Sequence, residues 1–294
     1  MLSNLIIDNT KNIIQKGVLY VVATPIGNLE DVTIRSIKVL SGVDVIAAED
    51  TRMTGRLLAH YDISTRLLAY HEHNEKTKSE DLIARLKNGE SVALVSDAGT
   101  PSVSDPGFRL VRAASADGIV VVPVPGVSAV ITALCAAGLP TDSFVFAGFP
   151  PRKKGRRYDF LQGLSEEKRT LIFYESPKRI IKFIHEIIEV LGPRPAVLGR
   201  EMTKLHEEFL RGDLVSIVDT LEDREKVKGE CTLIVSGGEK KQIEVDSIAE
   251  EIYERLKQPE VRPSMLAKEL AGKYSIRKKM VYEKIQLILN NSSN

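Results

Sequence analysis

The chain has 294 residues, more than one hydrophobic core usually organises, so about two domains of 100–200 residues are expected. Its 41 Lys and Arg residues nearly balance 40 Asp and Glu residues, which disfavours a uniformly basic nucleic-acid-binding surface but allows a local basic patch. The two cysteines, Cys135 and Cys231, form no CxxC pair, so a disulfide framework and a zinc site are both disfavoured. The N-terminus lacks a signal-peptide pattern, and proline and glycine interrupt the uncharged stretch 118–141. These features predict a cytoplasmic protein with no membrane span.

The first half of the chain alternates short β-branched runs with helical patterns. This βαβ alternation predicts a parallel sheet covered on both faces, in an N-terminal α/β domain over residues 17–138 that follows an extension over residues 1–16. The helical spacing of Ile34, Ile37 and Leu40 marks one of the covering helices. The predicted strands are Val18–Ala23, Val43–Ala48, Leu67–Tyr70, Val92–Ser96 and Ile119–Val124.

A second α/β domain is predicted over residues 139–238, and a helical tail over residues 239–294. The fold class is therefore α/β, with two α/β lobes and a small C-terminal helical appendage. In the second domain the predicted strands are Phe144–Ala147, Thr170–Tyr174, Ala196–Arg200 and Cys231–Val235, and the helices are Tyr158–Leu164, Ile180–Leu191 and Leu214–Leu221. In the tail the predicted helices are Ile248–Leu256, Ser264–Ala271 and Lys278–Leu289.

Two loops that follow early strands carry polar or turn-forming residues, and parallel sheets bind ligands outside the carboxyl ends of their strands. In the loop 23–31, proline and glycine, among them Pro25, force a tight turn that either approaches a ligand or is a plain turn with Asp31 capping the next helix. After the second strand come Glu49, Asp50 and Arg52. They either form a capped helix start with a salt bridge or hold a substrate and move a proton.

Two later loops are rich in small and hydroxyl residues. The loop 96–107 is longer than a connection requires, and its glycine allows a ligand to approach the backbone closely. It lacks the phosphate-loop pattern and carries acids, so a neutral or cationic small ligand fits it better than a phosphate. The loop 123–129 either brings Ser128 and Ala129 to a ligand or is a structural turn.

A run of cations and a pair of histidines complete the candidate groups. The cations Arg152, Lys153, Lys154, Arg156 and Arg157 are either solvated surface or a contact for an RNA backbone. His71 and His73 have the spacing of two metal ligands on one strand, but no third ligand can be placed, so no metal is expected. His71 is better interpreted as a polar residue of a site at a strand end.

Taken together, these loops resemble the tetrapyrrole methylase superfamily of S-adenosylmethionine-dependent methyltransferases, from about Gly17 to Ser236. Within it, they are similar to the branch that methylates a cytidine 2'-hydroxyl in 16S ribosomal RNA. Many tetrapyrrole-modifying members have Gly-Asp-Pro where this chain has Gly-Thr-Pro at 99–101, a departure that favours the ribosomal RNA branch. The segments that carry the resemblance are residues 22–29, 48–52, 96–107, 124–129, 149–152, 173–177 and 229–233.

The resemblance implies that S-adenosylmethionine is bound between two α/β lobes, that 16S ribosomal RNA in the small ribosomal subunit is the partner, and that the protein forms a homodimer. The residues expected to bind the cofactor are Pro25, Asp97, Ala98, Gly99, Thr100, Val103, Ser104, Ser128, Ala129 and, less directly, Tyr174.

For 2'-O-methylation the expected catalytic groups are Glu49, Asp50 or His71 as proton acceptor and Arg52 as a clamp, with the run 152–157 contacting the RNA backbone. Two other functions stay open. One is methylation of a tetrapyrrole ring carbon, since the arginine-rich loop could bind precorrin carboxylates. The other is a non-catalytic module that binds the ribosome during assembly, against which the intact ligand loop 97–105 counts.

Overall fold

The computed structural model describes residues 14–238, 245–257, 261–274 and 277–291. Most of the predicted N-terminal extension, residues 1–13, lies outside these ranges, as do the first residues of the predicted tail. Contacts within the chain divide it into two compact units, residues 1–237 and 238–294. Both predicted α/β lobes belong to the first unit, and each has its own sheet.

The first sheet contains five strands in the order β3-β2-β4-β1-β5, and every neighbouring pair is parallel. This confirms the predicted parallel sheet. Because the strand order reverses around β1 and β4, the loops after β1, β2, β4 and β5 meet at the carboxyl edge. The strands are β1 (Leu19–Val22), β2 (Val45–Ala48), β3 (Leu67–Ala69), β4 (Val92–Val95) and β5 (Val121–Val124).

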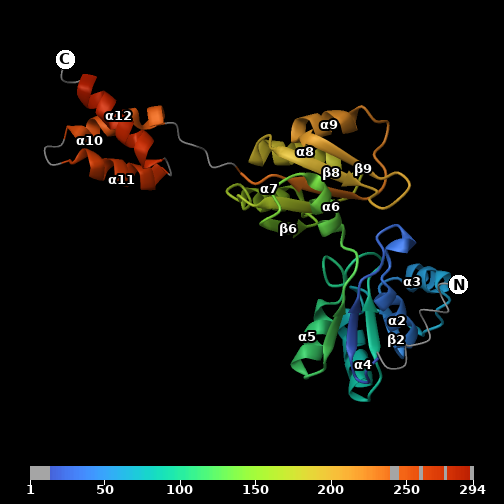
Figure 1. Ribbon diagram of the computed structural model, residues 1–294. Coiled ribbons are helices and arrows are strands. Elements are labelled where there is room, and N and C mark those ends of the chain that lie inside the picture. Colours follow the sequence, from blue (N-terminus) through green and yellow to red (C-terminus); the bar gives the residue numbers. More distant parts are fainter. Residues whose placement is uncertain (1–13, 239–244, 258–260, 275–276, 292–294) are drawn as a thin grey trace. The chain divides into compact units, whose positions relative to one another are not determined.

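Helices cover both faces of this sheet (Figure 1). On one face, α2 (Ile34–Gly42) and α3 (Thr51–His60) bury Leu40 and Leu58 against β-strand side chains. On the other face, α4 (Glu75–Lys87) and α5 (Phe108–Ala116) bury Leu86 and Leu110. The β-strands are apolar on both faces for this reason.

The second sheet is mixed, with the order β6-β7-β10-β8-β9. Only β6 and β7 pair in parallel, while β10 and β9 run antiparallel to their neighbours. Strand β9 was not predicted, because its sequence Glu-Phe-Leu-Arg-Gly-Asp is half charged, as suits an edge strand that pairs only with β8. The strands are β6 (Phe144–Gly148), β7 (Thr170–Glu175), β8 (Pro195–Arg200), β9 (Glu208–Asp213) and β10 (Cys231–Val235).

Helices α7 (Lys154–Gln162), α8 (Ile180–Leu191) and α9 (Leu214–Glu222) pack on one face of the second sheet. Helix α6 (Ala129–Ala137) packs on the other, where Ala133 and Leu134 meet strands β8 and β10. The sequence assigned this helix to the N-terminal domain, whereas its apolar face is buried by the second sheet. Helix α6, which links the two lobes along the chain, therefore packs as part of the second lobe.

The second unit contains the three predicted tail helices: α10 (Ala249–Leu256), α11 (Pro263–Tyr274) and α12 (Lys278–Asn291). A short 3₁₀ helix, η3 (Val245–Ile248), precedes them. Their shared core includes Ile252, Leu266, Leu270 and Val281. Among the described residues, no helix combines the length and apolar character needed to cross a membrane.

Candidate active site

The loops at the carboxyl edge of the first sheet are bonded to one another. Thr24, after β1, and Gly99, after β4, exchange backbone hydrogen bonds of 2.9 and 3.0 Å, and the Thr24 hydroxyl donates to the Ser96 carbonyl. The Thr100 hydroxyl donates to the carbonyl of Val127, in the loop after β5. The Asp50 N–H, in the loop after β2, donates to Asp97 Oδ1 at 2.9 Å. All four predicted loops are therefore joined as one surface.

A cavity of about 400 Å³ opens on this surface and extends to the second sheet. One wall comes from the loops after β1, β2, β4 and β5 of the first sheet. The other comes from the second sheet, at the ends of β6, β7 and β8 and the start of β10. The lining residues are Ile26, Glu49, Asp97, Ala98, Gly99, Thr100, Val103, Asp105, Ser128, Ala129, Phe149, Tyr174, Glu175, Ser176, Pro177, Met202, Gly229, Glu230, Cys231 and Thr232. We call it the cofactor cavity.

Every charged residue in the wall of the cofactor cavity is acidic: Glu49, Asp97, Asp105, Glu175 and Glu230. Burial raises the pKa of Asp105 to about 6, and the nearby carboxylates of Glu49 and Asp97 add to this shift while a hydrogen bond from Ser96 opposes it. Burial likewise raises the pKa of Glu49. A cationic ligand would stabilise these clustered carboxylates, and an anion would be repelled.

The chemistry of the walls fits S-adenosylmethionine. Its sulfonium and ammonium charges match the acids, and the volume lies in the range of small-molecule sites. The apolar residues Ile26, Phe149, Tyr174 and Met202 offer a surface for an adenine ring. The Tyr174 ring packs against Phe149 at 5.4 Å between centroids, and burial raises the pKa of its hydroxyl to about 12, so it stays neutral.

The loop 96–107 has an unusual backbone. Gly99 has a φ of 80°, which favours glycine, and Ser102 and Ser104 have φ values of 69° and 66° in the left-handed region. Such conformations in non-glycine residues cost on the order of 1–3 kcal/mol each and concentrate at functional sites. The strain is consistent with a loop shaped for a ligand.

The predicted cofactor residues Asp97, Ala98, Gly99, Thr100, Val103, Ser128, Ala129 and Tyr174 all line the cofactor cavity. Two others do not. Pro25 is buried behind the wall, and its neighbour Ile26 faces the cavity instead. Ser104 lines a second, neighbouring cavity.

The catalytic candidates separate in the structure. Only Glu49 reaches the cofactor cavity. Asp50 caps α3 by accepting the Arg52 N–H at 2.8 Å and pairs with the Arg52 guanidinium at 2.6 Å, so the alternative of a capped helix start is right for these two residues. This pairing holds the pKa of Asp50 well below its usual range. An acid so strongly stabilised as a carboxylate is a poor proton acceptor.

His71 lies off both cavity walls and is held by Asn74, whose side chain accepts the His71 backbone N–H at 2.9 Å. Within the described ranges, no group of three potential metal ligands occurs, and the His71–His73 pair has no third partner. In the first loop, Asp31 does not cap the following helix, because Thr33 accepts the Ser36 N–H at the start of α2. Asp31 instead ends a short 3₁₀ helix, η2 (Leu29–Asp31), which Asn28 caps.

The predicted RNA-binding run must be corrected at one position. Arg152, Lys153, Lys154 and Arg156 are exposed, but Arg157 is only 5% exposed. Its guanidinium pairs with Glu186 of α8, through a 2.7 Å bond from Nη2 and a second contact from Nε, and donates to the carbonyls of Pro151 and Arg152. Arg157 therefore anchors the loop and cannot contact an RNA backbone. We call the four exposed residues the cation cluster.

Several cavity residues lacked a predicted role. Glu175, Ser176 and Pro177 follow β7, and residues 229–232 lead into β10, which pairs with β7 so that Cys231 lies opposite Glu175. Both segments belong to those that carry the family resemblance. The pairing of β7 with β10 brings them together, and strand pairing is not visible in the sequence. In the sequence, Asp105 is one of the acids of the ligand loop, and no feature there marks it as catalytic.

The raised pKa of Asp105 predicts a pH-dependent effect on stability. A carboxyl whose pKa is higher in the folded state stabilises the fold most below about pH 4, and this contribution is lost as the pH rises through 6. Asp105→Asn should therefore stabilise the protein at pH 8 by about 1 kcal/mol, after allowance for solvent screening, or about 2–4 °C in Tm. At pH 4 the two proteins should melt together. Thermal unfolding at both values measures this, and an asparagine variant that is less stable at pH 8 would contradict it.

Comparison with known proteins identifies the family of this chain. The family model described as Tetrapyrrole (Corrin/Porphyrin) Methylases matches residues 18–218. The chain is 53% identical over 226 residues to Ribosomal RNA small subunit methyltransferase I of Halalkalibacterium halodurans, covering 76% of this chain and 78% of that protein. It is 46% identical to the Escherichia coli O157:H7 protein of the same name, covering 91% and 94%.

A solved structure described as uroporphyrin-III C-methyl transferase from Thermus thermophilus complexed with S-adenyl homocysteine has the same fold. The TM-score is 0.52, with 21% sequence identity, and the match covers 74% of this chain and 96% of that one.

Proposed function

Because this chain belongs to the tetrapyrrole methylase family of S-adenosylmethionine-dependent methyltransferases, we propose that it transfers a methyl group to the 2'-hydroxyl of a cytidine in small-subunit ribosomal RNA. The observation that carries the proposal is the acidic cofactor cavity at the edge of the parallel sheet. The names of the relatives, which cover most of the chain, support a ribosomal RNA substrate. The small ribosomal subunit as the bound partner, the cytoplasm as the location and a homodimer as the assembly belong to the same proposal.

S-adenosylmethionine supplies a methyl group whose bond to sulfur breaks, with the electron pair left on sulfur, as the ribose oxygen forms its new bond to carbon. The residues of this chain have two tasks: to align the hydroxyl and to take its proton. Alignment accounts for up to roughly 7–11 kcal/mol of such a barrier, and a positioned base for about 10²–10⁴-fold in rate. The acids of the cofactor cavity hold the cationic sulfur, and one of them accepts the proton.

We propose that the Asp105 carboxylate accepts the proton of the ribose hydroxyl. Its carboxyl lines the cofactor cavity and the neighbouring cavity, and its pKa of about 6 is close to neutral pH, where a base is most effective. Glu49 lines both cavities as well, but its Oε2 accepts the Asp97 N–H at 3.3 Å. Its charge helps to raise the pKa of Asp105, which makes Glu49 a positioning residue.

The cation cluster is proposed to bind the RNA backbone. Helix α7 begins at Lys154, so the positive end of its dipole adds to the side-chain charges. Replacing all four residues by alanine should make the dependence of log K on log salt shallower by up to about 3, since each phosphate contact to single-stranded RNA contributes about 0.7. Binding of small ribosomal subunits at several salt concentrations measures the slope. An unchanged slope would remove the cation cluster from the interface.

The function is tested with purified protein, S-adenosylmethionine labelled in the methyl group, and small ribosomal subunits that lack the modification. We expect labelled 2'-O-methylcytidine in 16S ribosomal RNA after nuclease digestion. Label on a base or on protein, or none above background, would refute the proposal. An enzyme that methylates a tetrapyrrole ring would instead label uroporphyrinogen or a precorrin. A methyltransferase should be stabilised against thermal unfolding by about 2.7 kcal/mol when S-adenosylmethionine is present at 100 times its dissociation constant. A non-catalytic assembly module would show no such stabilisation.

A further inference from the structure

A second cavity, of about 730 Å³, lies beside the cofactor cavity and shares two wall residues with it, Glu49 and Asp105. We propose that this cavity binds the nucleotide that is methylated, with its ribose at Glu49 and Asp105 and its base and phosphates along α5. The inference rests on the proposed function and specifies where its substrate lies. We call this space the acceptor cavity.

Glu49 and Asp105 lie where the two cavities meet. A methyl donor bound in the cofactor cavity would be separated from the acceptor cavity by these two carboxylates. A ribose hydroxyl placed at this junction would lie beside both the cofactor cavity and a proton acceptor. The proton of that hydroxyl goes to the Asp105 carboxylate as the oxygen–carbon bond forms, so the charges balance as the sulfonium becomes a neutral sulfide.

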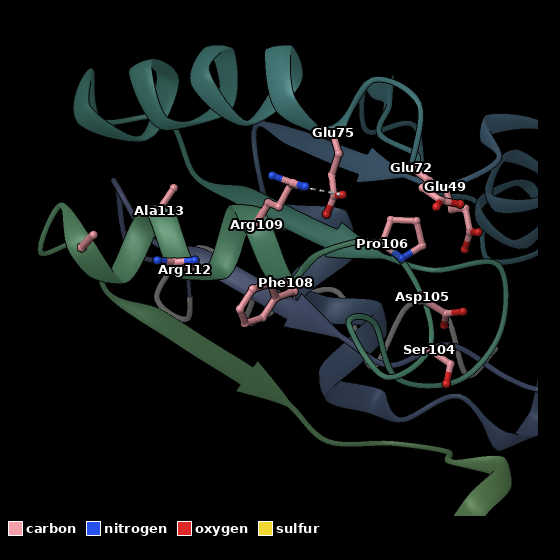
Figure 2. A pocket seen from close by; sticks show the side chains of 11 residues that line it. Glu49, Glu72, Glu75, Ser104, Asp105, Pro106, Phe108, Arg109, Arg112 and Ala113 are labelled. Carbon is pink, nitrogen blue, oxygen red and sulfur yellow. Dashed lines mark ion pairs between the residues drawn. The ribbon is translucent and has the colours of Figure 1, made fainter. Parts of the chain in front are cut away.

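Helix α5 forms one wall of the acceptor cavity. Phe108, Arg109 and Arg112 line it from the first turns of the helix, and Ala113 and Ala116 leave space beyond them. Arg112 is four residues after Phe108 and three after Arg109, so it lies beside each of them on the helix surface. Figure 2 shows the two arginines toward the α5 end of the cavity, and Asp105 and Glu49 toward the other end.

The charges of the acceptor cavity complement the parts of a nucleotide. Glu75 is neutralised where it lies, because it accepts an ion pair from Arg109 at 3.3 Å and the backbone N–H of Gly107 at 3.3 Å. Arg112 is exposed and makes no ion pair with another residue in the described part of the chain. Because Arg109 and Glu75 neutralise each other, Arg112 supplies the net positive charge along α5, while Glu49, Glu72 and Asp105 make the rest of the lining acidic. This suits a phosphate beside Arg112 and a hydroxyl that loses a proton at the junction.

Phe108 supplies the contact for a base. Its side chain is 63% exposed although it starts a helix whose other face is packed on the sheet. Bases stack on exposed aromatic rings with little dependence on sequence, and the alanine substitution of such a ring costs on the order of 10-fold in affinity. Within the acceptor cavity it is the one aromatic residue of the described lining.

The test measures two quantities for Phe108→Ala and Arg112→Ala: affinity for unmodified small ribosomal subunits in the presence of S-adenosylhomocysteine, and kcat/KM for methyl transfer. We expect Phe108→Ala to weaken both on the order of 10-fold. Arg112→Ala should weaken both several-fold and make the salt dependence of binding shallower by about 0.7. Affinity for S-adenosylhomocysteine alone should not change. The matched controls are Val120→Ala and Arg66→Ala, exposed residues just before β5 and β3, at the amino edge of the same sheet, and both should behave as wild type.

The two readouts separate this inference from the proposed function. Variants that bind subunits as tightly as wild type would overturn the acceptor cavity, whether or not the wild-type protein methylates them. A wild-type protein that transfers no methyl group, with subunit binding still weakened in both variants and in neither control, would refute the proposed function but support a nucleotide site along α5.

Discussion

Asp105→Asn is expected to lower the rate of methyl transfer by about 10²–10⁴-fold, the usual contribution of a positioned base. The amide has nearly the shape of the carboxyl but cannot take the ribose proton. Affinity for S-adenosylhomocysteine should be retained, since its sulfur is neutral and does not depend on the Asp105 charge. Single-turnover transfer to small ribosomal subunits, with calorimetric titration of S-adenosylhomocysteine, measures both quantities.

The pH profile distinguishes the roles of Asp105 and Glu49. In the wild-type protein the rate should fall as the pH decreases below about 6, with the midpoint moved lower when the cationic cofactor is bound. Glu49→Gln removes a negative charge that raises the pKa of Asp105, so the acidic limb should move to lower pH with a smaller loss of rate. A rate that survives in Asp105→Asn and collapses in Glu49→Gln would exchange the two assignments.

Arg157→Ala is expected to lower the free energy of unfolding by about 3–5 kcal/mol, because it leaves the Glu186 carboxylate buried without its partner. The Arg157 and Glu186 side chains are 6% and 12% exposed, and the pairing holds the pKa of Glu186 below its usual range. The neighbouring Arg156→Ala should cost almost nothing, because its side chain is exposed. Urea unfolding of the two variants provides the comparison.

A double variant shows that the pairing, and not the arginine alone, causes the loss. Arg157→Met combined with Glu186→Leu replaces the ion pair by apolar side chains and should recover most of the stability, as hydrophobic replacements of buried pairs commonly do. The contribution of Glu186 should also decline as the pH falls through the depressed pKa of its carboxyl. A single variant as stable as wild type would show that Arg157 is not an anchor.

The sequence predicted the sheet edge well, and for a physical reason. The runs that become β1, β2, β4 and β5 are rich in apolar residues, and the loops after these strands must lie together at one edge of a parallel sheet. The loop 96–107 was therefore expected to bind a ligand, and the family resemblance implied that Ser128 and Ala129 belong to the same site. Their place in the cofactor cavity agrees with that assignment.

The features that could not be predicted depend on contacts between distant residues. Arg157 and Arg156 look alike in a run of cations, and only Glu186, 29 residues away, distinguishes the buried one. Asp50 and Glu49 are adjacent, yet one caps α3 and the other faces the cofactor cavity. Phe108, Arg109 and Arg112 sit on a helix whose pattern was not singled out, so the acceptor cavity had no signal in the sequence.

The most direct test of the proposed function is the content of 2'-O-methylcytidine in 16S ribosomal RNA from cells that lack this protein, with the wild-type protein or the Asp105→Asn variant supplied again. The nucleoside should be lost without the protein, return with wild type, and stay absent with the variant present at the same level. The same 2'-O-methylcytidine content in all three strains would contradict the proposal.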